Sequence, residues 1–144
     1  MRAVLDPNVI ISALLSPTGA PARLLLAWQD GEFELVVSAA LLAALARALA
    51  YPKLRRHITA DEAEHVIAWL ARTATVALDP GDLPLARSVD PGDDYLLALA
   101  AAEDALLVSG DGHLLALWDA LPIQSPADFR RLLEAAPQDP STSA

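Results

Sequence analysis

Acidic residues stand where two apolar segments of this chain end. Asp6 directly follows the first apolar run, and Asp111 follows a later one after Ser-Gly. Asp93 and Asp94 open the helical segment that leads into that later run. If the two runs are neighbouring parallel strands, their carboxyl ends share one edge of a sheet, and these carboxylates meet there. Two unit charges 4 Å apart repel by about 4 kcal/mol at an effective dielectric of about 20, so such a cluster needs a cation.

The ligand types indicate which cation and which chemistry. The chain has no cysteine, and its three histidines are scattered. Ligands that are all oxygen favour Mg²⁺ or Mn²⁺ over zinc. A divalent cation of this kind activates water and neutralises the charge that develops on a phosphate. The pattern therefore predicts metal-assisted phosphodiester hydrolysis, with the ligands drawn from Asp6, Asp111 and the pair Asp93 and Asp94.

Each of these carboxylates also fits a purely structural role. Asp6 lies in Asp-Pro-Asn, which suits a turn or a helix N-cap. Asp93 and Asp94 suit the first turn of a helix, where negative charge favours the helix dipole. Asp111 could shape a turn in Ser-Gly-Asp-Gly. The structural alternatives stay open for each residue, but their matching positions favour a shared site.

The elements that must position these residues alternate between strand and helix. A parallel sheet covered by helices on both faces follows from that alternation. A capping box at residues 59–62 opens one of the helices, and Pro52 ends the one before it. The longest predicted loop covers residues 79–94. Strands are predicted at 2–5, 34–38, 75–78, 105–108 and 122–124, and helices at 8–15, 20–30, 39–50, from 59, 95–102, 113–118 and 126–133.

Length and composition bound the class of protein. A chain of 144 residues is about one domain long. Hydrophobic residues make up 54% of it, yet no apolar run approaches the roughly 20 residues of a membrane-spanning helix. The N-terminal sequence leaves no room for a signal peptide. We therefore predict a cytoplasmic protein without a membrane segment, with a single domain at residues 1–136 and a polar tail at 137–144.

The charge balance limits contacts with nucleic acid. The formal net charge is −9, so the whole molecule repels nucleic acid, and binding must depend on a local site. The single basic cluster comprises Arg47, Lys53, Arg55 and Arg56. It could contact RNA phosphates or a protein partner, although a solvated helix end is slightly favoured.

Five segments together resemble the PIN domain family, and within it the PIN-type toxins of bacterial toxin–antitoxin pairs. The resemblance covers roughly residues 1–133. The segments are LDPNVIISALLSPTGAPARLL, FELVVS with the leucine-rich helix that ends in YPKLRR, DPGDDYLLALA, LLVSGDGHLLAL and PIQSPADF.

This resemblance implies both a fold and a function. The fold would be a three-layer α/β/α sandwich around a five-stranded parallel sheet in the order 3-2-1-4-5. The activity would be that of a ribonuclease that depends on Mg²⁺ or Mn²⁺, with an antitoxin as partner, RNA as substrate and a homodimer as assembly. The implied metal ligands are Asp6, Asp93 and Asp111, and the implied supporting residues are Asn8, Ser109 and Asp94.

The chain departs from the family pattern at two positions. Pro7 stands where most members have threonine, and Ala44 stands where the helix after FELVVS usually carries a glutamate. A metal pocket with one carboxylate fewer is less negative, so metal affinity and rate should both fall. This leaves a second hypothesis, a PIN module with weakened or lost catalysis that binds a protein partner.

A third hypothesis is a haloacid-dehalogenase-like phosphatase. Asp-Pro-Asn and the later Ser-Gly-Asp match such an enzyme loosely. That chemistry requires an aspartate at position 8 and a lysine near the cleft, whereas the chain has Asn8 and a single, distant Lys53. We therefore rank it below the other two.

Overall fold

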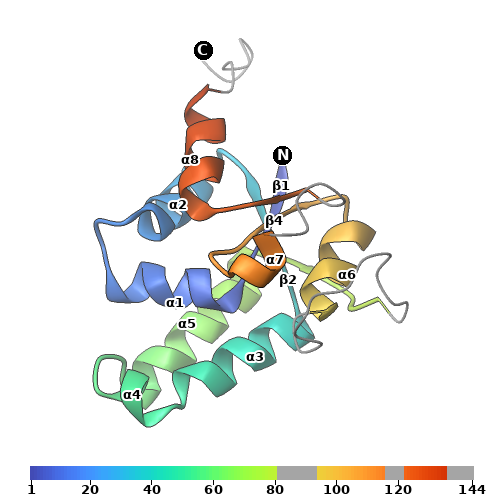
Figure 1. Ribbon diagram of the computed structural model, residues 1–144. Helices are drawn as coiled ribbons and strands as arrows, with labels where there is room; N and C mark the ends of the chain where they lie inside the picture. Colours follow the sequence, from blue (N-terminus) through green and yellow to red (C-terminus); the bar gives the residue numbers. More distant parts are fainter. Residues whose placement is uncertain (81–93, 116–121, 136–144) are drawn as a thin grey trace.

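The computed structural model describes residues 1–80, 94–115 and 122–135. Five parallel strands form one sheet in the order β3-β2-β1-β4-β5 (Figure 1). This confirms the predicted α/β class and strand order. The strands are β1 (Arg2–Leu5), β2 (Glu34–Ser38), β3 (Thr75–Ala77), β4 (Leu106–Val108) and β5 (Ile123–Gln124).

Helices fill the connections between these strands. Their order along the chain agrees with the prediction, apart from the short α4, which the sequence analysis did not predict. The predicted end of the helix at 113–118 and most of the predicted loop at 79–94 lie outside the described residues, as does the tail at 137–144. The helices are α1 (Pro7–Leu15), α2 (Ala20–Gln29), α3 (Ala39–Leu49), α4 (Pro52–Arg55), α5 (Ala60–Thr73), α6 (Asp94–Ala102), α7 (Gly112–Leu115) and α8 (Pro126–Ala135).

Side-chain caps fix where four of these helices begin. Asp6 caps α1, and Ser38, the last residue of β2, caps α3 through the N–H of Leu41. Thr59 and Glu62 form the predicted capping box of α5, and Ser125 caps α8 through the N–H of Asp128. Each cap satisfies N–H groups that the first turn of a helix leaves without partners. Three of these caps stand at strand ends, so β1, β2 and β5 pass into their helices without a loop.

The connections place helices on both faces of the sheet. The chain moves outward from β1 through β2 to β3, and α1, α2, α3 and α5 pack against one another along that path. It then returns past β1 to β4, so a right-handed connection places α6 on the opposite face. There α6 contacts β1 and β4, while α8 packs against α2 (Figure 1). This is the three-layer sandwich that the sequence predicts.

The core lies on both sides of β1, whose last three residues are fully buried. Two aromatic pairs support the helix layer. Trp28 and Trp69 join α2 to α5 with ring centroids 5.0 Å apart, and both are only half-buried. Phe33 and Phe129 meet edge to face at 5.1 Å. The tryptophans therefore serve as packing residues at the margin of the core.

The edge strand β3 is shorter and more exposed than predicted. It ends at Ala77, and the side chain of Leu78 is 91% exposed. Val76 is 54% exposed. A strand at the edge of a sheet pairs on one side only, so fewer neighbours cover its side chains.

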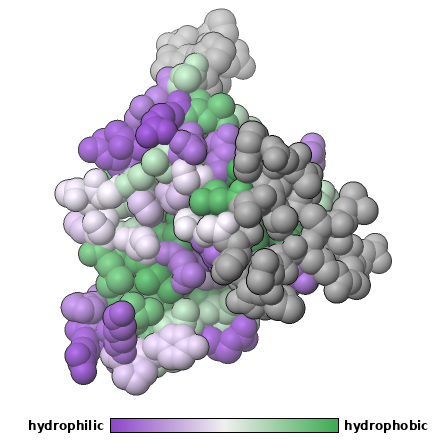
Figure 2. Space-filling model, in the orientation of Figure 1, coloured by the Kyte–Doolittle hydropathy of each residue, from purple (hydrophilic) through white to green (hydrophobic). Residues whose placement is uncertain are grey.

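The surface and the helix lengths complete the description. Figure 2 shows hydrophilic residues over α8 and α4, and a hydrophobic region between them over α1, where Leu15 is 43% exposed.

Within the described ranges, no single helix is long and apolar enough to cross a membrane. One pair, α1 with α2, meets the length and composition test together but is bent by 99°.

Candidate active site

Asp6 stands at the junction of β1 and α1. Its backbone N–H donates to the carbonyl of Val108, which extends the pairing of β1 with β4 by one residue. Its carbonyl accepts from the N–H of Val9, and its side-chain Oδ1 accepts from the N–H of Asn8 at 3.0 Å. Asp6 is therefore the N-cap of α1, as one of the alternatives predicts. The cap uses one carboxylate oxygen and leaves the other for a second partner.

Ser109 supplies that second partner. Its hydroxyl donates to Oδ2 of Asp6 at 2.8 Å and accepts from the backbone N–H of Asp111 at 3.0 Å. Its own N–H donates to the carbonyl of Gln124 in β5. The side chain of Ser109 is completely buried, and that of Asp6 is 4% exposed. One serine thus connects the ends of β1 and β5 and the turn that holds Asp111.

The charge balance at this junction disfavours an ionised Asp6. Burial raises the pKa of Asp6 above its ordinary value, and the charge of Asp111 raises it further. The hydrogen bonds from the N–H of Asn8 and the hydroxyl of Ser109 oppose this rise without cancelling it. A positive charge beside Asp6 would lower this pKa, because it favours the ionised form of the carboxyl group.

A cleft opens beside these residues. It has a volume of about 360 Å³, and its described lining consists of Asn8, Val9, Ser12, Pro21, Gly110, Asp111 and Pro126. These residues come from the first half of α1, the start of α2, the turn after β4 and the first residue of α8. The cleft is therefore at the carboxyl edge of the sheet, where open α/β sheets bind their ligands.

A family model for the PIN domain matches residues 2–113. The chain belongs to the PIN domain family. An uncharacterized protein of Methanocaldococcus jannaschii is 26% identical over 120 residues, covering 83% of this chain and 76% of that protein.

Several solved structures contain chains of similar fold. VapBC2 from Rickettsia felis, bound to a DNA fragment from its promoter, is 14% identical with a TM-score of 0.57, covering 87% of this chain and 98% of that chain. FitAcB from Neisseria gonorrhoeae is 19% identical with a TM-score of 0.53, and the match covers 87% of this chain and 98% of that chain. At these identities the likeness shows the fold.

The PIN domain brings some of the predicted site residues together. Asp6, Ser109 and Asp111 lie within one hydrogen-bonded group. Asn8 joins them through its backbone N–H, while its side chain is exposed. Asp94 is the first residue of α6 and is half-buried. A helix of a right-handed crossover runs antiparallel to its strands, so this residue stands at the carboxyl edge too.

The predicted third ligand, Asp93, lies outside the described residues. Among the described residues, no group of three acidic or histidine side chains is placed to hold a metal ion. The described part of the PIN domain therefore contributes two of the three predicted ligands.

The departures from the family pattern have different structural contexts. Pro7 is buried and is the first residue of α1, where the missing N–H costs no helical hydrogen bond and the fixed φ suits a helix start. Ala44 is half-buried in the second turn of α3, a helix that packs against α1. Proline at position 7 thus supports the junction that holds Asp6, while alanine at position 44 adds no ligand oxygen.

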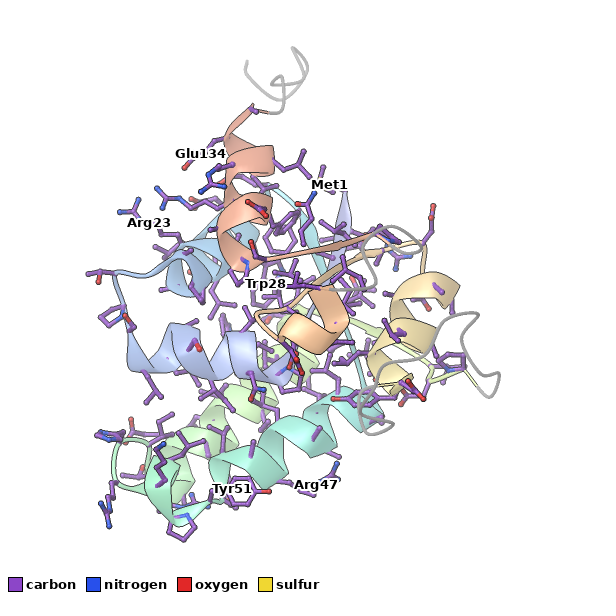
Figure 3. The ribbon with its side chains drawn as sticks, viewed as in Figure 1. Met1, Arg23, Trp28, Arg47, Tyr51 and Glu134 are labelled. Atoms are coloured by element: carbon purple, nitrogen blue, oxygen red, sulfur yellow. The ribbon has the colours of Figure 1, made fainter. Side chains whose placement is uncertain are left out.

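The predicted basic cluster lies away from this PIN site. Arg47 is in the last turn of α3, and Figure 3 shows it with Tyr51 at the α4 end of that helix. Because α3 begins at the carboxyl edge and rises about 1.5 Å per residue, its last turn is roughly 12 Å further along the helix axis. Lys53 and Arg56 are exposed, and Arg55 is half-buried.

The residues that are present fit a hard divalent cation. The donor set around Asp6 consists of carboxylate and hydroxyl oxygens. Each Asp6 oxygen accepts one hydrogen bond, which leaves lone pairs for a metal ion. Mg²⁺ and Mn²⁺ prefer such oxygen ligands, and they usually keep several waters.

Sequence reasoning missed five residues of the cleft wall, namely Val9, Ser12, Pro21, Gly110 and Pro126. Ser12 lies four positions after Asn8, so both share one face of α1. This spacing could have identified Ser12 as a neighbour of the site. The two prolines approach the cleft only through tertiary packing.

Proposed function

We propose that this PIN domain is a metal-dependent endoribonuclease and the toxin component of a toxin–antitoxin pair. The observation that supports this most is the bridge that Ser109 forms between Asp6 and Asp111. The bridge holds the buried Asp6 carboxylate near enough to Asp111 for the charge of Asp111 to raise the pKa of Asp6. A cation beside Asp6 would favour its ionised form, so the arrangement suits a cation site.

Each residue has a distinct part in the proposed reaction. Asp6 and Asp111, with Asp93, would hold the ion. The hydroxyl of Ser109 and the N–H of Asn8 fix the orientation of the Asp6 carboxylate, because they occupy one oxygen each. Bound Mg²⁺ or Mn²⁺ would supply an activated water and stabilise charge on the phosphate. The cleft beside Asp111 gives the RNA chain access to this edge.

The toxin assignment draws on family membership and on the similar structures. PIN domains in general are nucleases, and VapBC2 and FitAcB are complexes with partner proteins. The structures of VapBC2 and of FitAB also contain bound DNA. With a net charge of −9, this chain would leave DNA binding to its partner. A cognate antitoxin and a homodimer remain predictions from the resemblance, and a cytoplasmic location remains a prediction from the sequence.

Cleavage of RNA in the presence of metal tests the proposal. Purified wild-type protein should cleave RNA with Mg²⁺ or Mn²⁺ and lose this activity in EDTA. Asp6→Asn is the informative variant, because asparagine caps a helix about as well as aspartate and so preserves the start of α1. We expect cleavage by Asp6→Asn to fall by about 100-fold or more, beyond the 10–100-fold usual for residues outside the ligand set. Equal cleavage by the two proteins would contradict the proposal.

A second candidate function is a PIN module that binds a partner with catalysis weakened or lost. Ala44 favours it, because this position contributes no carboxylate. Ala44→Glu should then raise the metal-dependent cleavage rate. Ala43→Glu is the matched control, since it adds the same charge one position earlier on an exposed face of α3. Equal rates for the two variants and the wild type would show that the site does not use position 44.

A further inference from the structure

The wall of the cleft beside Asp111 is mostly uncharged. Asp111 is the one residue with a formal charge among the described residues that line it. The others are two prolines, a valine, a glycine, an asparagine and a serine. A surface that held only the phosphate chain would gain from basic side chains, and this wall contains none among its described residues.

The polar groups of the wall come from one face of α1. Asn8 and Ser12 are separated by one helical turn, and both side chains are exposed. Within the described part of the chain, neither side chain makes a hydrogen bond to another protein group. The amide of Asn8 offers an acceptor beside two donors, and the hydroxyl of Ser12 offers both functions. The edge of a nucleobase presents donors and acceptors in the same way.

The apolar groups of the wall are held rigidly. Pro21 is in the first turn of α2, and Pro126 is the first residue of α8, so helix geometry and a fixed φ set the position of both rings. Ligand sites typically combine apolar walls with a few polar groups that fix orientation. Rings from two elements and polar groups from a third give this cleft that composition.

We propose that this cleft is a nucleobase subsite, which takes one unpaired base of an RNA chain next to the bond that is cut. Its apolar contacts come from Pro21 and Pro126, and its hydrogen bonds to the base come from Asn8 and Ser12. A base within a duplex cannot enter such a cleft without leaving its stack, so the substrate class is single-stranded RNA. This inference rests on the proposed function for its biological meaning, but base binding can be measured without it.

The test uses nucleosides, which carry no phosphate, in EDTA, so neither metal nor catalysis contributes. Adenosine, cytidine and uridine are titrated into the full chain, and backbone amides are followed by NMR. We expect saturable shifts at Val9, Ser12 and Gly110 with at least one nucleoside. The variant Ser12→Leu removes the hydroxyl and fills the cleft without adding an aromatic ring on which a base could stack, so it should weaken this binding about tenfold or more. Ser16→Leu is the control, because Ser16 is an exposed serine at the other end of α1 that does not line the cleft, and it should bind as the wild type does.

The outcomes separate the subsite from the nuclease. If no nucleoside shifts these amides, or if Ser12→Leu binds as tightly as the wild type, the subsite is overturned even where RNA is cut. If nucleosides bind as expected but RNA stays intact with Mg²⁺ and Mn²⁺, the proposed nuclease function fails and the subsite stands.

Discussion

The sheet has an amino edge, where its parallel strands begin, and a carboxyl edge, where they end. The two edges differ in how their charged side chains are paired. At the amino edge, Arg2 lies between two acids, with Nη1 3.1 Å from Oε2 of Glu103 and Nε 3.2 Å from Oε2 of Glu34. The hydroxyl of Thr75 also donates to Glu34 at 2.6 Å, and this bond, followed by the charge of Arg2, lowers the pKa of Glu34. At the carboxyl edge, burial and, to a smaller extent, the charge of Asp111 raise the pKa of Asp6.

This difference separates structural charges from those available for chemistry. At the amino edge, Glu34 and Glu103 both pair with Arg2, so these charges have partners within the fold. At the carboxyl edge, the described hydrogen bonds orient Asp6 but supply no positive charge. Charged groups that the fold leaves at an electrostatic disadvantage are common at functional sites. The comparison therefore supports assigning catalysis to the carboxyl edge and stability to the amino edge.

Loss of the Ser109 hydroxyl should have the largest effect of the substitutions that separate the two edges. Ser109→Ala removes the bridge between Asp6 and Asp111, so metal affinity and RNA cleavage should fall by about 10–100-fold. Ser38→Ala is the matched control. Ser38 is equally buried at the end of β2, but its hydroxyl accepts from the N–H of Leu41. This substitution should cost about 1 kcal/mol of stability as a lost helix cap, with the cleavage rate per folded molecule unchanged.

Comparable losses of cleavage in the two serine variants would remove the distinction between these strand ends. Thermal unfolding of both proteins is measured alongside, so that a loss of folded protein is not read as a loss of activity.

Arg2 should affect stability and leave the chemistry intact. Arg2→Gln breaks two ion pairs at the amino edge, where the arginine side chain is 33% exposed. Partly exposed pairs contribute about 0–1 kcal/mol each, so the melting temperature should fall by roughly 2–4 °C. Circular dichroism gives the melting temperature, and the RNA cleavage assay gives the rate. A loss of cleavage without a change in stability would contradict the division between the edges.

Glu34 should produce a smaller effect that depends on pH. Its pKa in the folded protein is below the ordinary value of 4.5, so its stabilising contribution is present above that value. The contribution is lost as the pH falls through the folded pKa. Glu34→Gln should therefore lower the melting temperature near neutral pH, and this difference from the wild type should shrink as the pH falls below 4.5. A difference that stays constant with pH would show that the charge of Glu34 has no part in it.

The strand ends were the part of the site that local sequence could predict. Alternating apolar and helical segments placed Asp6 and Asp111 on one edge, because all strands of a parallel sheet point the same way. The roles of Asn8 and Ser109 came only from the resemblance to the PIN family. The local sequence does not show that the Ser109 hydroxyl donates to Asp6, since this contact depends on the pairing of β1 with β4.

Other features depended on contacts between distant parts of the chain. Arg2 and Glu103 are 101 positions apart, and no sequence period marks them as partners. Pro21 and Pro126 reach the same cleft from two helices. The short α4 follows Pro52, which sequence reasoning took as the end of a helix, whereas the ring also suits the first position of the next one. Pro52 thus marked a boundary between elements, but it did not show that a second helix begins there.

Calorimetric titration with Mn²⁺ tests the central claim most directly, because it asks whether the carboxyl edge is a cation site without requiring catalysis. The account predicts one site in the wild-type protein, lost in Asp6→Asn and in Asp111→Asn but retained in Glu34→Gln. Asp6→Asn keeps the cap of α1, so its lost binding would report on the carboxylate rather than on the fold. Equal Mn²⁺ binding by the wild type and Asp6→Asn, or loss of binding in Glu34→Gln, would contradict the account.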